Sequence, residues 1–134
     1  MSPMQIAAIY AAFHLILAPI LILRVGRVRI ANNVNIGDGG NDVLFARIRA
    51  HANYTENTPL ALIGLFALAL LNASSIGLHI FGAGFLLGRI LHAHGMAQSR
   101  SNGKGRLLGV LLSLLSFLGM AIYLLILIFT SNNL

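Results

Sequence analysis

Residues 46–71 read ARIRAHANYTENTPLALIGLFALALL, and in this stretch a polar helix face runs into an apolar segment. Arg49, Asn53 and Glu56 stand at positions i, i+4 and i+7, so a helix would carry a cation, an amide and an anion on one face. From Pro59 to Leu71 the stretch is almost wholly apolar. Ionisable groups that enter a membrane are costly and usually face a site or a partner. The stretch therefore predicts a membrane helix whose polar face has a function.

The composition excludes an ordinary soluble domain. Of the 134 residues, 57% are hydrophobic and only 9% are charged, a balance typical of integral membrane proteins. The formal charge of +6 lies at the ends of apolar segments, where it suits anionic lipid headgroups or an anionic ligand and not nucleic acid. Because there is no cysteine, thiol chemistry would need a thiol brought by the substrate.

Four apolar stretches predict a single all-α domain, an integral membrane four-helix bundle over residues 1–134. The expected spans are residues 4–23, 44–72, 75–95 and 106–130. A span needs about 20 residues to cross roughly 30 Å of hydrocarbon. The second helix is expected to begin upstream of its apolar run, so that the polar face forms its first half. Because the connection around residues 72–75 is short, the second and third helices should be antiparallel neighbours.

The connections between the apolar stretches hold most of the polar residues. Asp38-Gly39-Gly40 is typical of a turn, and Asp42 is expected to be the N-cap of the second helix. We interpret both acids as turn and cap residues and not as metal ligands. With four spans, the first and third connections share a side, and all nine basic residues fall on or near it: Arg24, Arg27, Arg29, Arg47, Arg49, Arg89, Arg100, Lys104 and Arg106. The positive-inside bias places both long loops in the cytoplasm and both termini outside.

Small residues and histidines suggest how the third and fourth helices meet. Gly84 and Gly88 form a GxxxG pair, and Gly109 with Ser113 forms a similar notch, which lets helix backbones approach closely. His94 is rotated by about 200° from His92 on a helix, so the pair does not chelate one metal ion. Antiparallel packing brings six polar residues to a similar depth, in a site with excess positive charge that suits a ligand with carboxylates and an amine: Arg49, Asn53, Glu56, Arg89, His92 and Arg106.

These residues resemble the motifs of a known family. RAHANYTENTP, at residues 49–59, resembles the R-A-H-x-N-x-x-E-x-x-P signature of the MAPEG superfamily, the membrane-associated proteins of eicosanoid and glutathione metabolism. GRILHAHG, at residues 88–95, looks like its G-R-x-x-H element, and IGDGG, at residues 36–40, is similar to its small bacterial branch. Length, number of spans and order of motifs also agree, so the resemblance covers nearly the whole chain and implies a bacterial inner-membrane protein.

The resemblance implies a homotrimer of four-helix subunits that binds glutathione between neighbouring subunits, near the cytoplasmic side. Asn53 and Glu56 would hold the polar groups of the peptide, with Glu56 at its amino end. Arg49 and Arg89 would brace or line the site. His92 would approach the ligand from the third helix.

The resemblance also implies activation of the glutathione thiol. Arg106 is the best match to the family's thiol-activating arginine, and Arg27 or Arg29 would fill the place of an arginine near the end of the first helix. Only the thiolate is a good nucleophile, and a permanently charged guanidinium stabilises it without exchanging a proton. The expected function is a membrane glutathione-dependent transferase or peroxidase. Glutathione would be the co-substrate, and a lipophilic electrophile or hydroperoxide would enter from the lipid.

Two positions depart from the family pattern. Ala52 stands where several catalytic relatives have an arginine, and Met96 where some have a tyrosine. Both changes remove ligand contacts, so a non-catalytic membrane trimer that binds lipid or glutathione is the alternative function. A small multidrug transporter fits less well, because the acid expected in the first span is absent and only His14 interrupts that span.

Each candidate residue also has a structural interpretation. Arg49, Arg89 and Glu56 would form a buried ion network that sets the registry of the helices. Arg106 would extend its guanidinium to the membrane interface, and His92 would pack as a neutral histidine. The remaining residues would serve as headgroup anchors (Arg24, Arg27 and Arg29) or as incidental or helix-bridging groups (His14 and His79).

Overall fold

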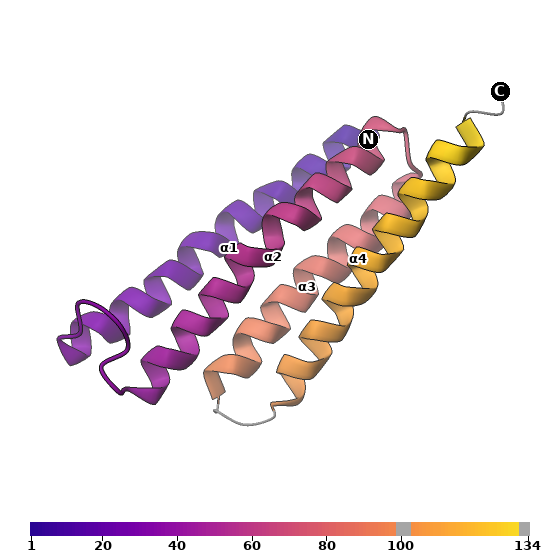
Figure 1. Ribbon diagram of the computed structural model, residues 1–134. Helices are drawn as coiled ribbons and strands as arrows, with labels where there is room; N and C mark the ends of the chain where they lie inside the picture. Colours follow the sequence, from indigo (N-terminus) through magenta and orange to yellow (C-terminus); the bar gives the residue numbers. More distant parts are fainter. Residues whose placement is uncertain (99–102, 132–134) are drawn as a thin grey trace.

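The computed structural model describes residues 1–98 and 103–131, and it consists of four long helices (Figure 1). These are α1 (Pro3–Asn32), α2 (Asp42–Leu70), α3 (Ser75–Gln98) and α4 (Lys104–Ser131). Successive helices run in opposite directions and lie side by side as a bundle (Figure 1). Within the described ranges the chain forms no strand, which confirms the all-α class.

The helix ends do not coincide with the ends of the apolar stretches. The first apolar stretch ends near residue 23, whereas α1 continues through three arginines to Asn32, where Asn33 closes it in the left-handed conformation with φ 54°. Hydropathy marks where apolar residues end, whereas a cap marks where a helix ends. At the start of α2 the N-cap is Asn41, whose side-chain oxygen accepts from the backbone N–H of Leu44 at 2.9 Å, and Asp42 is the first helical residue. The prediction of Asp42 as the N-cap was wrong by one residue, because Asn and Asp serve equally well there.

The loop before α2 has the predicted turn. Asp38 accepts a hydrogen bond from the backbone N–H of Gly40 at 3.0 Å, and Gly37, Gly39 and Gly40 all have positive φ. Arg29 secures this loop, because its Nη1 donates to the carbonyl oxygen of Gly37 at 2.8 Å. The loop is therefore held against the end of α1 by local contacts.

Three helices of the described chain are long and apolar enough to cross a membrane: α1, α3 and α4. Their outward faces carry many exposed leucine, isoleucine and phenylalanine side chains. α2 does not meet the same standard, because its first half is polar and its apolar second half begins only after Pro59. It nevertheless packs against α1 and α3 within the bundle (Figure 1). A fourth span in α2 remains a prediction.

α3 and α4 touch through the small residues that the sequence singled out. A Cβ added to Gly88 would lie 2.7 Å from Ser113 Oγ and 3.0 Å from the carbonyl oxygen of Gly109. A Cβ added to Gly84 would lie 3.0 Å from Ser116 Oγ. The backbones are therefore in direct contact, which confirms the predicted notches.

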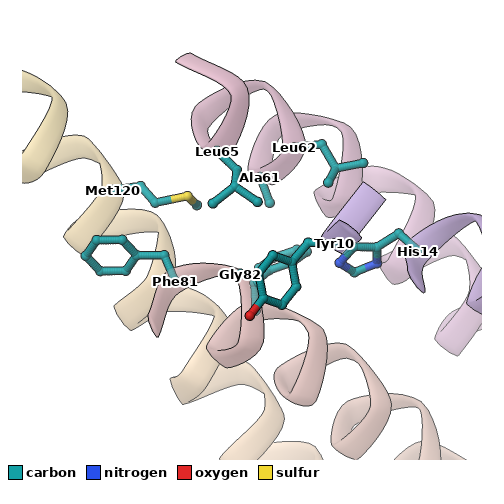
Figure 2. A pocket seen from close by; sticks show the side chains of 9 residues that line it. Tyr10, His14, Ala61, Leu62, Leu65, Phe81, Gly82 and Met120 are labelled. Atoms are coloured by element: carbon teal, nitrogen blue, oxygen red, sulfur yellow. The ribbon is translucent and has the colours of Figure 1, made fainter. Parts of the chain in front are cut away.

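The interior near the chain termini is closed and filled by side chains. Figure 2 shows Tyr10 and His14 of α1 beside residues of α2, α3 and α4, around a cavity of about 10 Å³. This volume has room for roughly one water molecule. Tyr54 of α2 donates to the carbonyl oxygen of His14 at 2.7 Å, and Tyr10 lies 2.8 Å from His79 Nδ1. His14 and His79 are thus helix-bridging residues, and a larger ligand must bind elsewhere.

Replacing Gly109 by alanine should separate α3 from α4. The new Cβ would lie 2.5 Å from the backbone nitrogen of His92 and 2.6 Å from the carbonyl oxygen of Gly88, and neither backbone atom can turn aside. We expect a loss of about 1–3 kcal/mol in the free energy of unfolding, measured by thermal unfolding in detergent. Gly64→Ala is the control, because its Cβ would make an ordinary contact of 3.6 Å with Met120. Equal melting temperatures for the two variants would contradict the packing account.

Candidate functional site

One end of the bundle collects the charged residues. The end of α1, the start of α2, the end of α3 and the start of α4 all lie there (Figure 1). Eight basic residues of the described chain belong to these helix segments: Arg24, Arg27, Arg29, Arg47, Arg49, Arg89, Lys104 and Arg106. The other end, with the N-terminus and the α2–α3 connection, has no lysine or arginine in the described ranges. Any strongly anionic ligand therefore belongs at the basic end.

An open cavity of about 280 Å³ lies at this basic end, between α2, α3 and α4. Its polar wall consists of Arg49, Asn53, His92 and Arg106, and its apolar wall of Phe45, Ala46 and Met96. None of the three acids of the chain is among these described lining residues. The cavity thus combines cationic and apolar lining groups. We call it the basic cavity.

Two arginines of the basic cavity are available to a ligand. Arg49 and Arg106 are both exposed, and neither side chain makes a hydrogen bond or ion pair with another residue of the described chain. His92 is only 5% exposed and presents its ring from α3. Asn53 is half-buried on α2. Three helices therefore bring two free guanidinium groups, an imidazole and an amide to one space.

Arg89 lies beneath the basic cavity and does not line it. It is 3% exposed and bonded on all sides within the bundle. Its Nε donates to Ser113 Oγ at 3.0 Å, its Nη1 donates to Asn53 Oδ1, and its Nη2 reaches Ser113 Oγ and the carbonyl oxygen of Gly109. Arg89 thereby ties α2, α3 and α4 together behind the cavity wall. The predicted ion network is absent at Arg89, because all its acceptors are uncharged.

Besides Arg89, two predicted site residues lie outside the basic cavity of the single chain. Glu56 is exposed on α2, although it is three residues beyond Asn53. Arg27 is exposed on α1 and is not a lining residue either. Of the two arginines considered near the end of the first helix, Arg29 is engaged with loop carbonyl groups, so Arg27 is the one that remains available.

The approach of α3 to the start of α4 sets the position of Arg106. A Cβ added to Gly95 would overlap the backbone nitrogen of Arg106 and lie 2.8 Å from the carbonyl carbon of Gly105. The absence of a side chain at Gly95, one turn after His92 on α3, thus lets the backbone of Arg106 lie against α3. Sequence reasoning did not single out Gly95, although its place directly after the HAH motif was a usable signal.

Two further contributors to the site were missed. Phe45 and Ala46 form part of the cavity wall, and Phe45 stands one helical turn before Arg49, so the helical period alone could have indicated it. Ser113 was interpreted only as a packing notch, yet it is a main acceptor for Arg89. Its pairing with Arg89 joins α3 to α4, and no pattern in the sequence near either residue predicts this pairing. Among the described residues no three His, Asp or Glu side chains converge as a metal site.

Comparison with known proteins places the chain in a family. The model of the MAPEG family matches residues 7–126. The inner membrane protein YecN of Escherichia coli K12 is 32% identical over 91 residues, which cover 68% of this chain and 70% of that protein, and YecN of Escherichia coli O6:H1 matches equally. The name of this relative gives a location and no activity. No solved structure matches. The motifs, the helical bundle and the extent of these matches show that the chain belongs to the MAPEG family, which includes glutathione-dependent transferases and peroxidases.

Proposed function

We propose that the protein is a membrane glutathione-dependent transferase or peroxidase, with its thiol site in the basic cavity. The observation that carries the proposal is the convergence of Arg49, Asn53, His92 and Arg106 from three helices on one open cavity. Glutathione has two carboxylates, a thiol and an amine. Free guanidinium groups suit the carboxylates and the thiolate, and the amide of Asn53 suits a peptide group.

Arg106 is the proposed thiol-activating residue. It is exposed, has no ion-pair partner in the described chain, and lies at the start of α4. A free thiol of the cysteine type has a pKa of about 8.5, and each unit of lowering needs about 1.4 kcal/mol of preferential stabilisation of the thiolate. One hydrogen-bonded guanidinium in a partly desolvated cavity can supply one to two such units.

Two reactions follow from a stabilised thiolate. With an electrophile, the sulfur forms a bond to carbon and the leaving group or opened ring takes a proton. With a hydroperoxide, two glutathione molecules supply two electrons, which gives an alcohol, water and glutathione disulfide. In both reactions the lipophilic substrate would approach along the apolar wall at Phe45 and Met96.

A homotrimer would complete the site. The basic cavity, at about 280 Å³, lies just below the range of about 300–1,000 Å³ usual for ligand pockets. It also lacks an acid for the amine of glutathione among its lining residues. Glu56, in the middle of α2, and Arg27, near the end of α1, are both exposed, so a neighbouring subunit could bring them into use. We propose that glutathione binds between subunits, with Glu56 near its amine and Arg27 contributed from α1 of the neighbour.

The proposed orientation follows from the charges. The basic end of the bundle would face the cytoplasm, where glutathione is made, and both termini would lie outside. The chain would sit in the inner membrane, as the name of its relative states for that protein.

Substituting Arg106 by alanine should abolish formation of the glutathione thiolate. The test is the ultraviolet absorbance of the thiolate when glutathione is added to detergent-solubilised protein. Lys104→Ala is the matched control, because Lys104 is an exposed cation two residues away on the same helix but does not line the basic cavity. We expect a thiolate signal in the wild type and in Lys104→Ala, and at least a tenfold smaller signal in Arg106→Ala.

Two other outcomes would change the assignment. A full signal in Arg106→Ala would assign thiol activation to another residue. Calorimetric binding of glutathione without any thiolate signal would favour the alternative function, a non-catalytic trimer that binds glutathione or lipid. Met96, which lines the basic cavity where some relatives have a tyrosine, is the observation that keeps this alternative in view.

Mixed oligomers test whether Arg27 acts on a neighbour's site. Arg27→Ala and Arg106→Ala should each bind glutathione poorly alone. If one site takes Arg106 from one subunit and Arg27 from the next, co-assembly at equal amounts leaves about a quarter of the sites intact. We expect calorimetry to recover tight binding at about that fraction of sites. The control is the same two variants purified separately and then mixed without subunit exchange. No recovery on co-assembly would place both arginines in the same chain's site, whereas full binding by Arg27→Ala alone would exclude Arg27 from the site.

A further inference from the structure

Arg89 is a buried cation whose counter-charge is missing from its own surroundings. Its acceptors are Ser113 Oγ, Asn53 Oδ1 and the carbonyl oxygen of Gly109, none of which carries a charge. The side chain is 3% exposed and lies within α3, one of the three helices that can span a membrane. Hydrogen bonds satisfy the donors but leave the net charge in place.

The acids of the chain do not neutralise Arg89. Glu56 is exposed on α2, while Asp38 and Asp42 belong to the α1–α2 connection and the first turn of α2. Buried cations at membrane depth normally pair with an acid or face a water-filled space. The nearest space of that kind is the basic cavity, because Asn53 both bonds to Arg89 and lines the cavity.

The amide of Asn53 thus separates the guanidinium of Arg89 from any occupant of the basic cavity. Across one amide group, in surroundings of low dielectric constant, a positive charge attracts an anion strongly without touching it. Phe85 covers the guanidinium on another side, with its ring centroid 5.4 Å from Arg89 Cζ, so little water screens the charge there. A neutral donor could make the same hydrogen bonds, so the charge itself needs a further explanation.

We infer that Arg89 is a fixed positive charge that selects and stabilises an anion in the basic cavity without touching it, and that Ser113 and Asn53 are the residues that position it. This inference rests on the proposed function only in taking the glutathione thiolate as the physiological anion. It assigns Arg89 a role different from that of Arg106, which would contact the sulfur. It also gives Ser113, a residue on α4 outside the cavity, a part in ligand selection.

The first test neutralises Arg89 without removing it. Ser113→Asp places a carboxylate at the main acceptor of Arg89, and Ser113→Asn is its neutral control of the same shape. The probe is inorganic sulfate at millimolar concentration, with ionic strength held constant by sodium chloride, and the readout is the shift in melting temperature. We expect sulfate to stabilise the wild type and Ser113→Asn, and to bind Ser113→Asp at least tenfold more weakly.

The second test removes the charge. Arg89→Met is compared with Arg89→Lys, which keeps the charge and loses part of the hydrogen bonding. We expect sulfate affinity to fall at least tenfold in Arg89→Met and to stay within about threefold of wild type in Arg89→Lys. In a glutathione titration, the pKa of the bound thiol should rise by about one unit in Arg89→Met and Ser113→Asp, and by clearly less in Arg89→Lys and Ser113→Asn, which keep the positive charge.

The outcomes separate this inference from the proposed function. Equal sulfate affinity within both pairs would show that Arg89 is only a structural clamp and would overturn the inference. If sulfate distinguishes the members of each pair but glutathione does not bind, the inference stands and the proposed function fails. If Arg89→Met does not fold, the Ser113 pair decides the question, because aspartate and asparagine have nearly the same size and differ in charge.

Discussion

The direct contact between α3 and α4 is the constraint on which the candidate site depends. Glycines at 88, 95, 105 and 109 leave no side chain between the two backbones. A Cβ at Gly88, Gly95 or Gly109 would lie 3.0 Å or less from a backbone atom of the opposite helix. Lipid gives helices no hydrophobic reason to associate, so close packing and interhelical hydrogen bonds must hold them together. The contact also has a chemical consequence. It brings His92 and Arg106 to one cavity and puts Ser113 within reach of Arg89.

The polarity of the bundle changes along its length. Near the chain termini the interior is apolar and filled, and its polar groups, Tyr10, His14 and Tyr54, are engaged with each other or with neighbouring backbone. At the opposite end the interior contains a buried guanidinium and an open, cationic cavity. The outward faces of α1 and α4 stay apolar over much of their length. A polar ligand therefore has one region of the described chain that suits it, and exposed leucine side chains of α4 extend to the same end of the bundle.

Much of the fold could be predicted because its signals are local. Four apolar stretches gave four helices, the short connection near Asn72 made α2 and α3 antiparallel neighbours, and the glycine notches were real contacts. Helix ends were harder, since Asn33 and Asn41 cap helices by backbone geometry that hydropathy does not record. The expectation that α2 spans the membrane also goes beyond what its own composition supports.

The candidate site could be predicted only in part. The spacing of Arg49, Asn53 and Glu56 gave one helix face, but a face is broad, and Asn53 turns toward Arg89 while Glu56 stays exposed. The direction of each side chain depends on which neighbour packs against α2, and that neighbour is distant in sequence. For the same reason the motif around Arg89 suggested a ligand contact, whereas its partner Ser113 lies 24 residues away on α4 and holds it beneath the cavity.

Some predicted site residues line the basic cavity, whereas Glu56 is exposed outside it, and this difference bears on how glutathione would bind. The basic cavity of one chain offers only cationic, amide, imidazole and apolar groups, so it matches the carboxylates and the thiolate but not the amine. Glu56 is the acid of α2 closest in sequence to Asn53, and it is exposed and does not line the basic cavity. Burying an unpaired carboxylate against lipid would be unfavourable. A neighbouring subunit over this face of α2 would shield Glu56 from lipid and enclose the space between it and Asn53. The same contact would then meet both needs, a partner for the acid and a binding group for the amine.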